Sequence, residues 1–141
     1  MPRTDPSVEL LSSVDLFAGL KKKDLAKVVA ASKEMTFAAG AVVTAEGDTD
    51  SRFYVIAEGS ARVTVNGRKR ATLKEGDYFG EIALLDGGPR SATVVAETPL
   101  RTFTLAPWNF KPLLKENPDI TYNILLGMCT RLRNVERPPT P

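Results

Sequence analysis

The chain has 141 residues, 43% of them hydrophobic, and 19 Lys and Arg against 17 Asp and Glu give a formal net charge of +2. This length supports one hydrophobic core, so we expect a single domain over residues 1–141. The near-balanced charge lacks the basic excess of nucleic-acid-binding proteins, and no apolar run reaches the roughly 18 residues of a membrane helix. We therefore expect neither a DNA nor a membrane partner.

The sequence contains no histidine and a single cysteine, Cys129. Because imidazole is the usual general base near neutral pH and the commonest metal ligand, we expect no enzymatic activity and no bound metal. Cys129 lies in an apolar stretch of helical pattern, which predicts a packed core thiol. One cysteine forms no internal disulfide, and the N-terminal segment does not resemble a signal peptide, so we expect a cytoplasmic protein.

The N-terminal third changes from a helical pattern to a strand pattern. Apolar residues at helical spacing predict two short packing helices, over residues 7–18 and 22–31. From residue 34 to about 106, short β-prone runs alternate with turns, which is typical of an antiparallel sandwich or barrel. Asn66 and Gly67 separate two of these runs and predict a two-residue hairpin turn, because both central residues of such a turn need positive φ.

The C-terminal part, about residues 107–137, returns to a helical pattern. In its first segment, WNFKPLLKEN, we expect Pro112 to break or delay the helix, because proline donates no backbone hydrogen bond. The second segment opens with Pro118 and Asp119, residues typical of a first helical turn. Its apolar face must be covered, and the alternatives are permanent packing, a dimer contact or a lid over a ligand.

One segment, GDYFGEIALLDGGPRSATV at residues 76–94, interrupts the strands with a short helix. Glu81 and Arg90 flank the turn within it, and Gly80 allows a ligand close to the backbone at the helix start. Arginine binds phosphate oxygens in a two-pronged geometry, whereas a carboxylate accepts hydrogen bonds from hydroxyl groups. A cyclic phosphate beside a ribose 2′-hydroxyl fits both side chains. The alternative is that they pair with each other or are solvated.

The run FGEIALLDGGPRSATV, residues 79–94, resembles the phosphate-binding cassette of cyclic nucleotide-binding domains. LFAGL at residues 16–20, FYVIAEGSARV at 53–63 and ENPDI before the last helix extend the resemblance over nearly the whole chain. It implies a mainly β fold with flanking helices: an eight-stranded antiparallel jelly-roll barrel with the cassette helix between its sixth and seventh strands. The flanking helices are those expected near residues 7–31 and 107–137.

The resemblance also implies a set of ligand-binding residues. In the family, the cassette glycine and glutamate hold the ribose, the arginine and the small residues after it hold the cyclic phosphate, and the start of the cassette helix approaches the phosphate. A strand residue lines the floor of the base site, and a residue of the last helix closes the pocket. The corresponding residues here are Gly80, Glu81, Ile82, Ala83, Arg90, Ser91, Ala92 and Val63, with Arg131 as the expected lid and Arg133 and Val135 as alternatives.

The function implied is that of a regulatory sensor, in which cyclic nucleotide binding is coupled to movement of the C-terminal helix. Ser91, rather than a threonine, follows the arginine, which favours cyclic AMP over cyclic GMP. We expect no other cofactor, an effector protein or domain as partner, and possible pairing of two copies through the last helix. The alternative is a nucleotide-free β-barrel that serves as a scaffold or interaction module.

Overall fold

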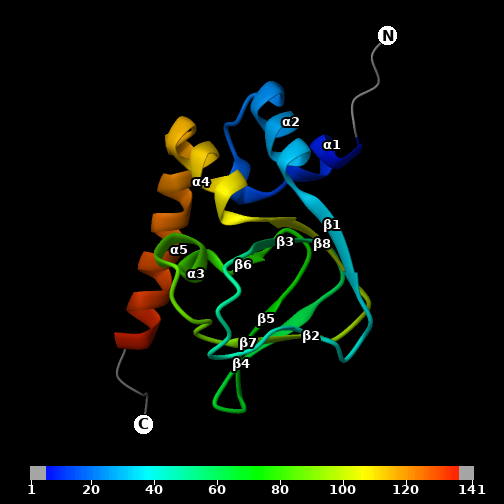
Figure 1. Ribbon diagram of the computed structural model, residues 1–141, viewed down its shortest axis with the longest axis vertical. Helices are drawn as coiled ribbons and strands as arrows, with labels where there is room; N and C mark the ends of the chain where they lie inside the picture. The colour runs from blue at the N-terminus through cyan, green and yellow to red at the C-terminus, as the bar shows by residue number, and fades with distance from the viewer. Residues whose placement is uncertain (1–5, 137–141) are drawn as a thin grey trace.

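The computed structural model describes residues 6–136, with helices at one end and along one side of the strands (Figure 1). The N-terminal elements are α1 (Pro6–Ser12), the short 3-10 helix η1 (Asp15–Phe17) and α2 (Lys22–Ala31). The prediction of one helix over residues 7–18 is wrong, because the hydroxyls of Ser12 and Ser13 donate to the carbonyls of Glu9 and Leu10. Such side-chain bonds compete with the helical backbone pattern, and Val14 is extended.

Within the described residues, eight strands form two four-stranded antiparallel sheets, ordered β1-β8-β3-β6 and β2-β7-β4-β5. The expected eight-stranded antiparallel architecture is thereby confirmed, as two sheets. Asn66 (φ 53°) and Gly67 (φ 77°) form the predicted hairpin turn. The strands are β1 (Lys33–Phe37), β2 (Val42–Thr44), β3 (Phe53–Glu58), β4 (Ala61–Val65), β5 (Arg68–Leu73), β6 (Tyr78–Phe79), β7 (Thr93–Ala96) and β8 (Leu100–Leu105).

Strand β3 connects the two halves of the core. Its residues Phe53 and Val55 pack against the helices, whereas Tyr54 and Ile56, which alternate with them, pack between the sheets. Successive side chains of a strand point to opposite faces, so a strand covered on both sides needs a continuous apolar run. This explains the sequence FYVIA, in which every residue is buried.

Two C-terminal helices, α4 (Pro107–Glu116) and α5 (Pro118–Glu136), follow the last strand. The prediction that Pro112 breaks or delays the first is wrong: α4 begins at Pro107 and continues through Pro112. Proline inside a helix gives up one backbone hydrogen bond and crowds the carbonyl four residues earlier, here that of Trp108 in the first turn, and α4 accommodates both. None of the helices in residues 6–136 is both long and apolar enough to span a membrane.

The first half of α5 is part of the core. Ile120 and Ile124 are 0% and 2% exposed, and the Asn123 side-chain amide donates to the Leu16 carbonyl at 3.0 Å. Of the three alternatives for the apolar face of the last helix, permanent packing is therefore confirmed for the first half of α5. Cys129 is exposed, so the prediction of a core thiol is wrong. Its position, five residues after Ile124, places it on the outer side of the helix.

Candidate functional site

The cassette places the short helix α3 (Glu81–Asp86) between β6 and β7. Gly80 caps its N-terminus with φ 94°, a conformation that few other residues adopt. A Cβ atom on Gly80 would lie 2.6 Å from Nη1 of Arg90 and 2.7 Å from the carbonyl oxygen of Arg52. Glycine is therefore required here for a second reason, because the Arg90 side chain packs directly against the backbone.

Arg90 is buried, with 5% of its surface exposed. Its Nη2 donates to the Arg52 carbonyl at 2.6 Å and its Nη1 donates to the Gly80 carbonyl at 3.4 Å. Its Nε has no partner in the part of the chain that the structure describes. Backbone bonds to residues 47 and 48, in the β2–β3 loop, fix the position of Arg90 in the chain. A buried guanidinium with a donor left unpaired is costly unless another group accepts from it.

A carboxylate from the same loop lies beside this guanidinium. Asp50 Oδ2 lies 3.6 Å from Nη2 of Arg90 and accepts from Arg52 at 2.9 Å. Burial raises the pKa of Asp50, but the Arg52 hydrogen bonds and the charges of Arg52 and Arg90 outweigh it and lower the pKa to about 2. Two guanidinium groups against one ionised carboxylate leave a formal charge of +1 at this point.

Two stacked aromatic rings, those of Tyr54 and Phe79, lie beside the charged groups. The Tyr54 ring stacks on Phe79 with 4.8 Å between centroids, and the guanidinium carbons of Arg90 and Arg52 lie 5.8 and 5.9 Å from the Tyr54 ring centroid. The Tyr54 hydroxyl lies 3.4 Å from Asp50 Oδ2, at the long end of hydrogen-bond distance. Burial, followed by the negative charge of Asp50, raises the pKa of Tyr54. The Tyr54 ring is thus within cation–π distance of both arginines, whose orientation is set by hydrogen bonds to Asp50 and to backbone carbonyls.

Glu81 is 2% exposed, and its carboxylate is held from a distant part of the chain. Arg131 on α5 donates through Nη1 to Oε1 of Glu81, whereas Oε2 has no partner within the described residues. The ion pair joins a buried carboxylate to a side chain that is 53% exposed. One acceptor atom of Glu81 is thus free to bind a hydroxyl donor.

The other expected residues surround these two side chains in the cassette and on β4. Ala83 is buried, Ala92 and Val63 are partly buried, Ser91 is exposed and Ile82 is 38% exposed. Glu81 and Arg90 do not pair with each other, and neither is solvated, so that alternative is wrong. The side chain of Val135 lies outside the described residues.

Sequence reasoning missed the residues that support the two central side chains. Asp50, Arg52 and Tyr54 hold Arg90, and Tyr78 lies beneath α5, where its hydroxyl occupies the space that a Cβ on Gly127 would need. Burial, followed by the charge of Glu81, raises the pKa of Tyr78. An Asp-x-Arg-x-Tyr pattern that runs into the start of β3 was the available signal, but nothing local relates it to a loop 40 residues later.

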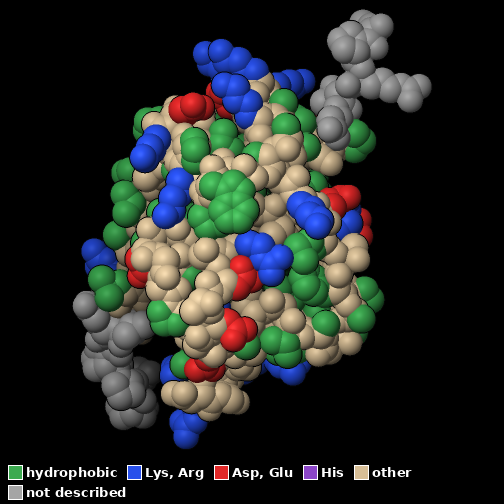
Figure 2. Space-filling model, in the orientation of Figure 1, with side chains coloured by type: hydrophobic (Ala, Val, Ile, Leu, Met, Phe, Trp, Pro, Cys, Tyr) green, Lys and Arg blue, Asp and Glu red, His purple; other side chains and the backbone are tan. Residues whose placement is uncertain are grey.

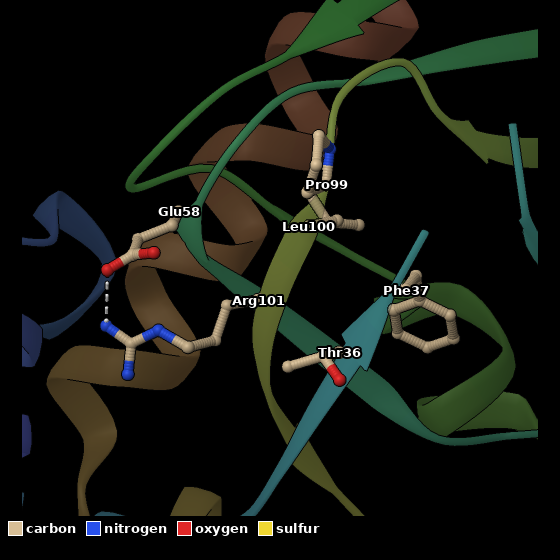
Figure 3. Close-up of a pocket in the computed structure, with 6 residues that line it drawn as sticks. All are labelled: Thr36, Phe37, Glu58, Pro99, Leu100 and Arg101. Carbon is tan, nitrogen blue, oxygen red and sulfur yellow. Dashed lines mark hydrogen bonds and ion pairs between the residues drawn. The ribbon is translucent and has the colours of Figure 1, made fainter. Parts of the chain in front are cut away.

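A cavity of about 170 Å³ lies elsewhere, between β1, β3 and β8. Figure 3 shows Arg101 at its wall with Glu58 pointing toward the guanidinium, and Glu34 also pairs with Arg101. Two carboxylates neutralise this arginine and would repel an anion, so the cavity is a poor phosphate site. The remaining lining residues are Thr36, Phe37, Pro99 and Leu100.

Comparison with known proteins gives one consistent family. Residues 34–117 match the family model described as "Cyclic nucleotide-binding domain". The cAMP-dependent protein kinase regulatory subunit of Aspergillus niger is 39% identical over 112 residues, which are 78% of this chain and 27% of that protein. The chain thus spans about a quarter of the length of the curated relatives it matches.

Solved structures agree with the family match. The regulatory domain of Toxoplasma gondii PKA crystallised with cAMP has a TM-score of 0.76 and 28% identity, covering 89% of this chain and 48% of that one. Thermus thermophilus catabolite activator protein has a TM-score of 0.78 and 28% identity, covering 86% of this chain and 59% of that one.

Proposed function

The chain belongs to the cyclic nucleotide-binding domain family, and on that basis we propose that it binds cyclic AMP in its cassette and acts as a regulatory sensor rather than an enzyme. One observation carries the proposal. Glu81 and Arg90 are both buried, and each keeps one polar atom that has no partner among the described residues 6–136, the acceptor Oε2 and the donor Nε. Buried polar atoms are normally paired, so these two are the atoms that a ligand would engage.

The charges at the cassette support a monoanionic ligand. The formal +1 left by Arg90, Arg52 and Asp50 matches the single negative charge of a cyclic phosphodiester. Glu81, already neutralised by Arg131, is suited to accept from an uncharged 2′-hydroxyl. Arg90, Ser91, Ala92 and the backbone of Ala83 are the proposed phosphate contacts. Gly80 and Glu81 hold the ribose, Ile82 begins the cassette helix, and Val63 lines the floor of the base site.

The ion pair between Arg131 and Glu81 supports a coupling of nucleotide binding to the position of α5. Glu81 has two oxygens, and in this proposal Arg131 binds Oε1 while the ribose hydroxyl binds Oε2. Both then stabilise the same position of the carboxylate, so nucleotide favours the docked state of the second half of α5. A ligand shifts a conformational equilibrium only through such a difference in contacts. The effector that senses this helix is another protein or domain.

Calorimetric titration of the natural chain with cyclic AMP and cyclic GMP tests the proposal. We expect cyclic AMP to bind more tightly, and Arg90→Leu to weaken it about tenfold to a hundredfold or more, since a charge-assisted hydrogen bond contributes about 1.5–3 kcal/mol. Arg101→Leu is the matched control, because it removes an ion-paired arginine outside the cassette. Chromatography of the titrated nucleotide should return it unhydrolysed.

The outcomes separate the alternatives. If neither nucleotide binds the natural chain, the scaffold function is favoured and the proposal fails. If both arginine variants lose affinity equally, the site is not at the cassette. Unfolding midpoints of both variants show whether a loss reflects lost structure, and Arg90→Lys, which keeps the charge without the two-pronged geometry, should have intermediate affinity.

A further inference from the structure

The lysines of this protein gather at one end of the molecule. Helices α2 and α4 lie side by side there, and the side-chain amide of Asn109 on α4 donates to the Ala31 carbonyl at the end of α2 at 3.4 Å (Figure 1). Seven of the nine lysines in the sequence lie on these two helices, at the N-cap of α2 or just after its end, and all seven are exposed. We call this surface the lysine face, and its lysines are Lys21, Lys22, Lys23, Lys27, Lys33, Lys111 and Lys115.

The lysine face holds a positive charge that the net charge of the chain conceals. Against its seven lysines, α2 and α4 carry only two acids, Asp24 and Glu116, for a formal +5, so the remainder of the sequence carries −3. None of the seven lysines has an ion pair in the part of the chain that the structure describes. Lys21, Lys22 and Lys23 also surround the N-terminus of α2, where the helix dipole disfavours cations. Their placement therefore acts against the stability of α2.

Trp108 lies on the outward side of α4, next to these lysines. It is the only tryptophan in the sequence, and 76% of its surface is exposed. Helical spacing places it on the same side of α4 as Lys111 and Lys115, opposite the buried Phe110 and Leu114. Figure 2 shows a large hydrophobic group on the near face of the molecule with basic side chains on several sides of it. Tryptophan is highly buried on average and is enriched at interfaces, so this exposure indicates a binding surface.

The composition of the lysine face favours a lipid surface over a protein surface. All seven of its cations are lysines, whereas the arginines of residues 6–136 lie on strands, on the loops between them and on α5. Protein interfaces are enriched in arginine and depleted of lysine. A cluster of about four to eight basic residues with an exposed aromatic side chain is typical of surfaces that bind anionic lipids. Lysine ammonium groups contact the lipid headgroups, and the amphipathic indole ring prefers the boundary between water and hydrocarbon.

We propose that the lysine face binds the surface of an anionic phospholipid bilayer, with the indole ring of Trp108 in the headgroup region. From the net charge and the lack of a spanning segment we expected no membrane partner, but neither property depends on where the charges lie. Binding at the surface requires no spanning helix. The formal +5 at one end and −3 on the rest of the chain turn the helices toward the lipid. Glu81 and Arg90 do not belong to this face, so the binding does not require nucleotide.

Sedimentation of the full chain with sucrose-loaded vesicles tests the binding. The natural chain should sediment with phosphatidylcholine vesicles that contain about 30% phosphatidylserine, but not with vesicles of phosphatidylcholine alone. About 0.5 M sodium chloride should release it, because salt screens the attraction. Lys111→Glu with Lys115→Glu should weaken the binding about thirtyfold or more, since each lysine near an anionic surface contributes a factor of about five. A natural chain that does not sediment with the phosphatidylserine vesicles overturns the proposal.

The two lysines outside the lysine face provide a matched control. Lys69→Glu with Lys74→Glu makes the same change in net charge on β5 and directly after it. This variant should keep the vesicle affinity of the natural chain within about threefold, because charges away from the contact are screened. Circular dichroism verifies that both double variants are folded. Equal losses in the two variants would show attraction by net charge alone and overturn the assignment to this face.

Fluorescence gives a second readout, because Trp108 is the only tryptophan and reports its own surroundings. With phosphatidylserine vesicles its emission should shift to the blue, and bromine-labelled lipid in the same vesicles should quench it. Trp108→Ala should weaken the sedimentation with vesicles. Vesicle binding without a shift or quenching would overturn the placement of Trp108 in the bilayer. Soluble polyglutamate is the comparison for an acidic protein partner, and a shift with polyglutamate but not with vesicles would overturn the lipid assignment.

Discussion

Arg131 on α5 and Glu81 on α3 form an ion pair across 50 residues of sequence. The carboxylate is buried and the guanidinium is largely exposed, so the pair joins the interior of the cassette to a helix on the surface. Within the described residues, Arg131 is the only cation that contacts Glu81. This makes the pair the direct physical connection between the proposed ribose site and α5.

Arg131→Ala should weaken cyclic AMP binding about tenfold to a hundredfold. The substitution leaves the Glu81 carboxylate buried without its counter-ion, and removal of one partner of such a pair costs more than the pair contributes. Calorimetry measures the affinity, and hydrogen exchange should show that nucleotide protects residues 128–136 in the natural chain but not in the variant. Arg133→Ala, at an exposed position without an ion pair in residues 6–136, is the control. Equal losses in both variants would contradict the role of Arg131.

Most of the fold could be predicted because its signals are local. Helix α2 occupies the residues that the apolar periodicity predicts, and the hairpin at Asn66 and Gly67 follows from turn chemistry alone. Two helix predictions were wrong because another interaction outweighed the local sequence signal. Two serine side chains end α1 early, and α4 tolerates Pro112 because packing of Phe110, Leu113 and Leu114 outweighs one lost hydrogen bond.

The candidate site could be predicted only where its residues are close in sequence. Glu81 and Arg90 belong to one cassette, and their spacing around a turn indicates a shared site. Asp50 and Tyr54 reach Arg90 from a loop and strand that no local pattern connects to it. The exposure of Cys129 was missed because α5 is apolar on two sides, so periodicity alone does not identify the inner face.

A methyl group at Gly127 should be destabilising, although alanine favours a helix over glycine by about 1 kcal/mol. Its Cβ would lie 2.5 Å from the Tyr78 hydroxyl, so Gly127→Ala should lower the free energy of unfolding by about 1 kcal/mol through overpacking. In Tyr78→Phe, which lacks that oxygen, the same change should instead raise it by about 0.5 kcal/mol. Urea unfolding of the four proteins gives the coupling energy. The same effect in both backgrounds would show that α5 does not rest on Tyr78.

Asp50 should stabilise the protein at neutral pH but not in strong acid. Its pKa is lowered from 3.8 to about 2, so its contribution is complete above about pH 4 and is lost as the pH falls through 2. With allowance for solvent screening, we expect Asp50→Asn to lower the free energy of unfolding by about 1–2 kcal/mol at pH 7. Urea titrations at pH 7 and pH 2 should show this difference shrinking by half or more. Asp48→Asn, an exposed change in the same loop, is the control, and a difference independent of pH would contradict the assignment.

The free Oε2 of Glu81 should make binding sensitive to the ribose 2′-hydroxyl. In the natural chain, 2′-deoxy cyclic AMP should bind about tenfold to a hundredfold more weakly than cyclic AMP, because it leaves a buried carboxylate oxygen unpaired. Glu81→Ala also releases Arg131 and weakens both ligands, but that loss is common to them and cancels in their ratio. The deoxy penalty should therefore fall below about threefold in Glu81→Ala. Glu58→Ala, which removes a carboxylate paired with Arg101 instead, should keep the full penalty. If the penalty is equal in Glu81→Ala and in the natural chain, the 2′-hydroxyl does not bind Glu81 but another group. The role of Glu81 is then limited to its ion pair with Arg131 on α5.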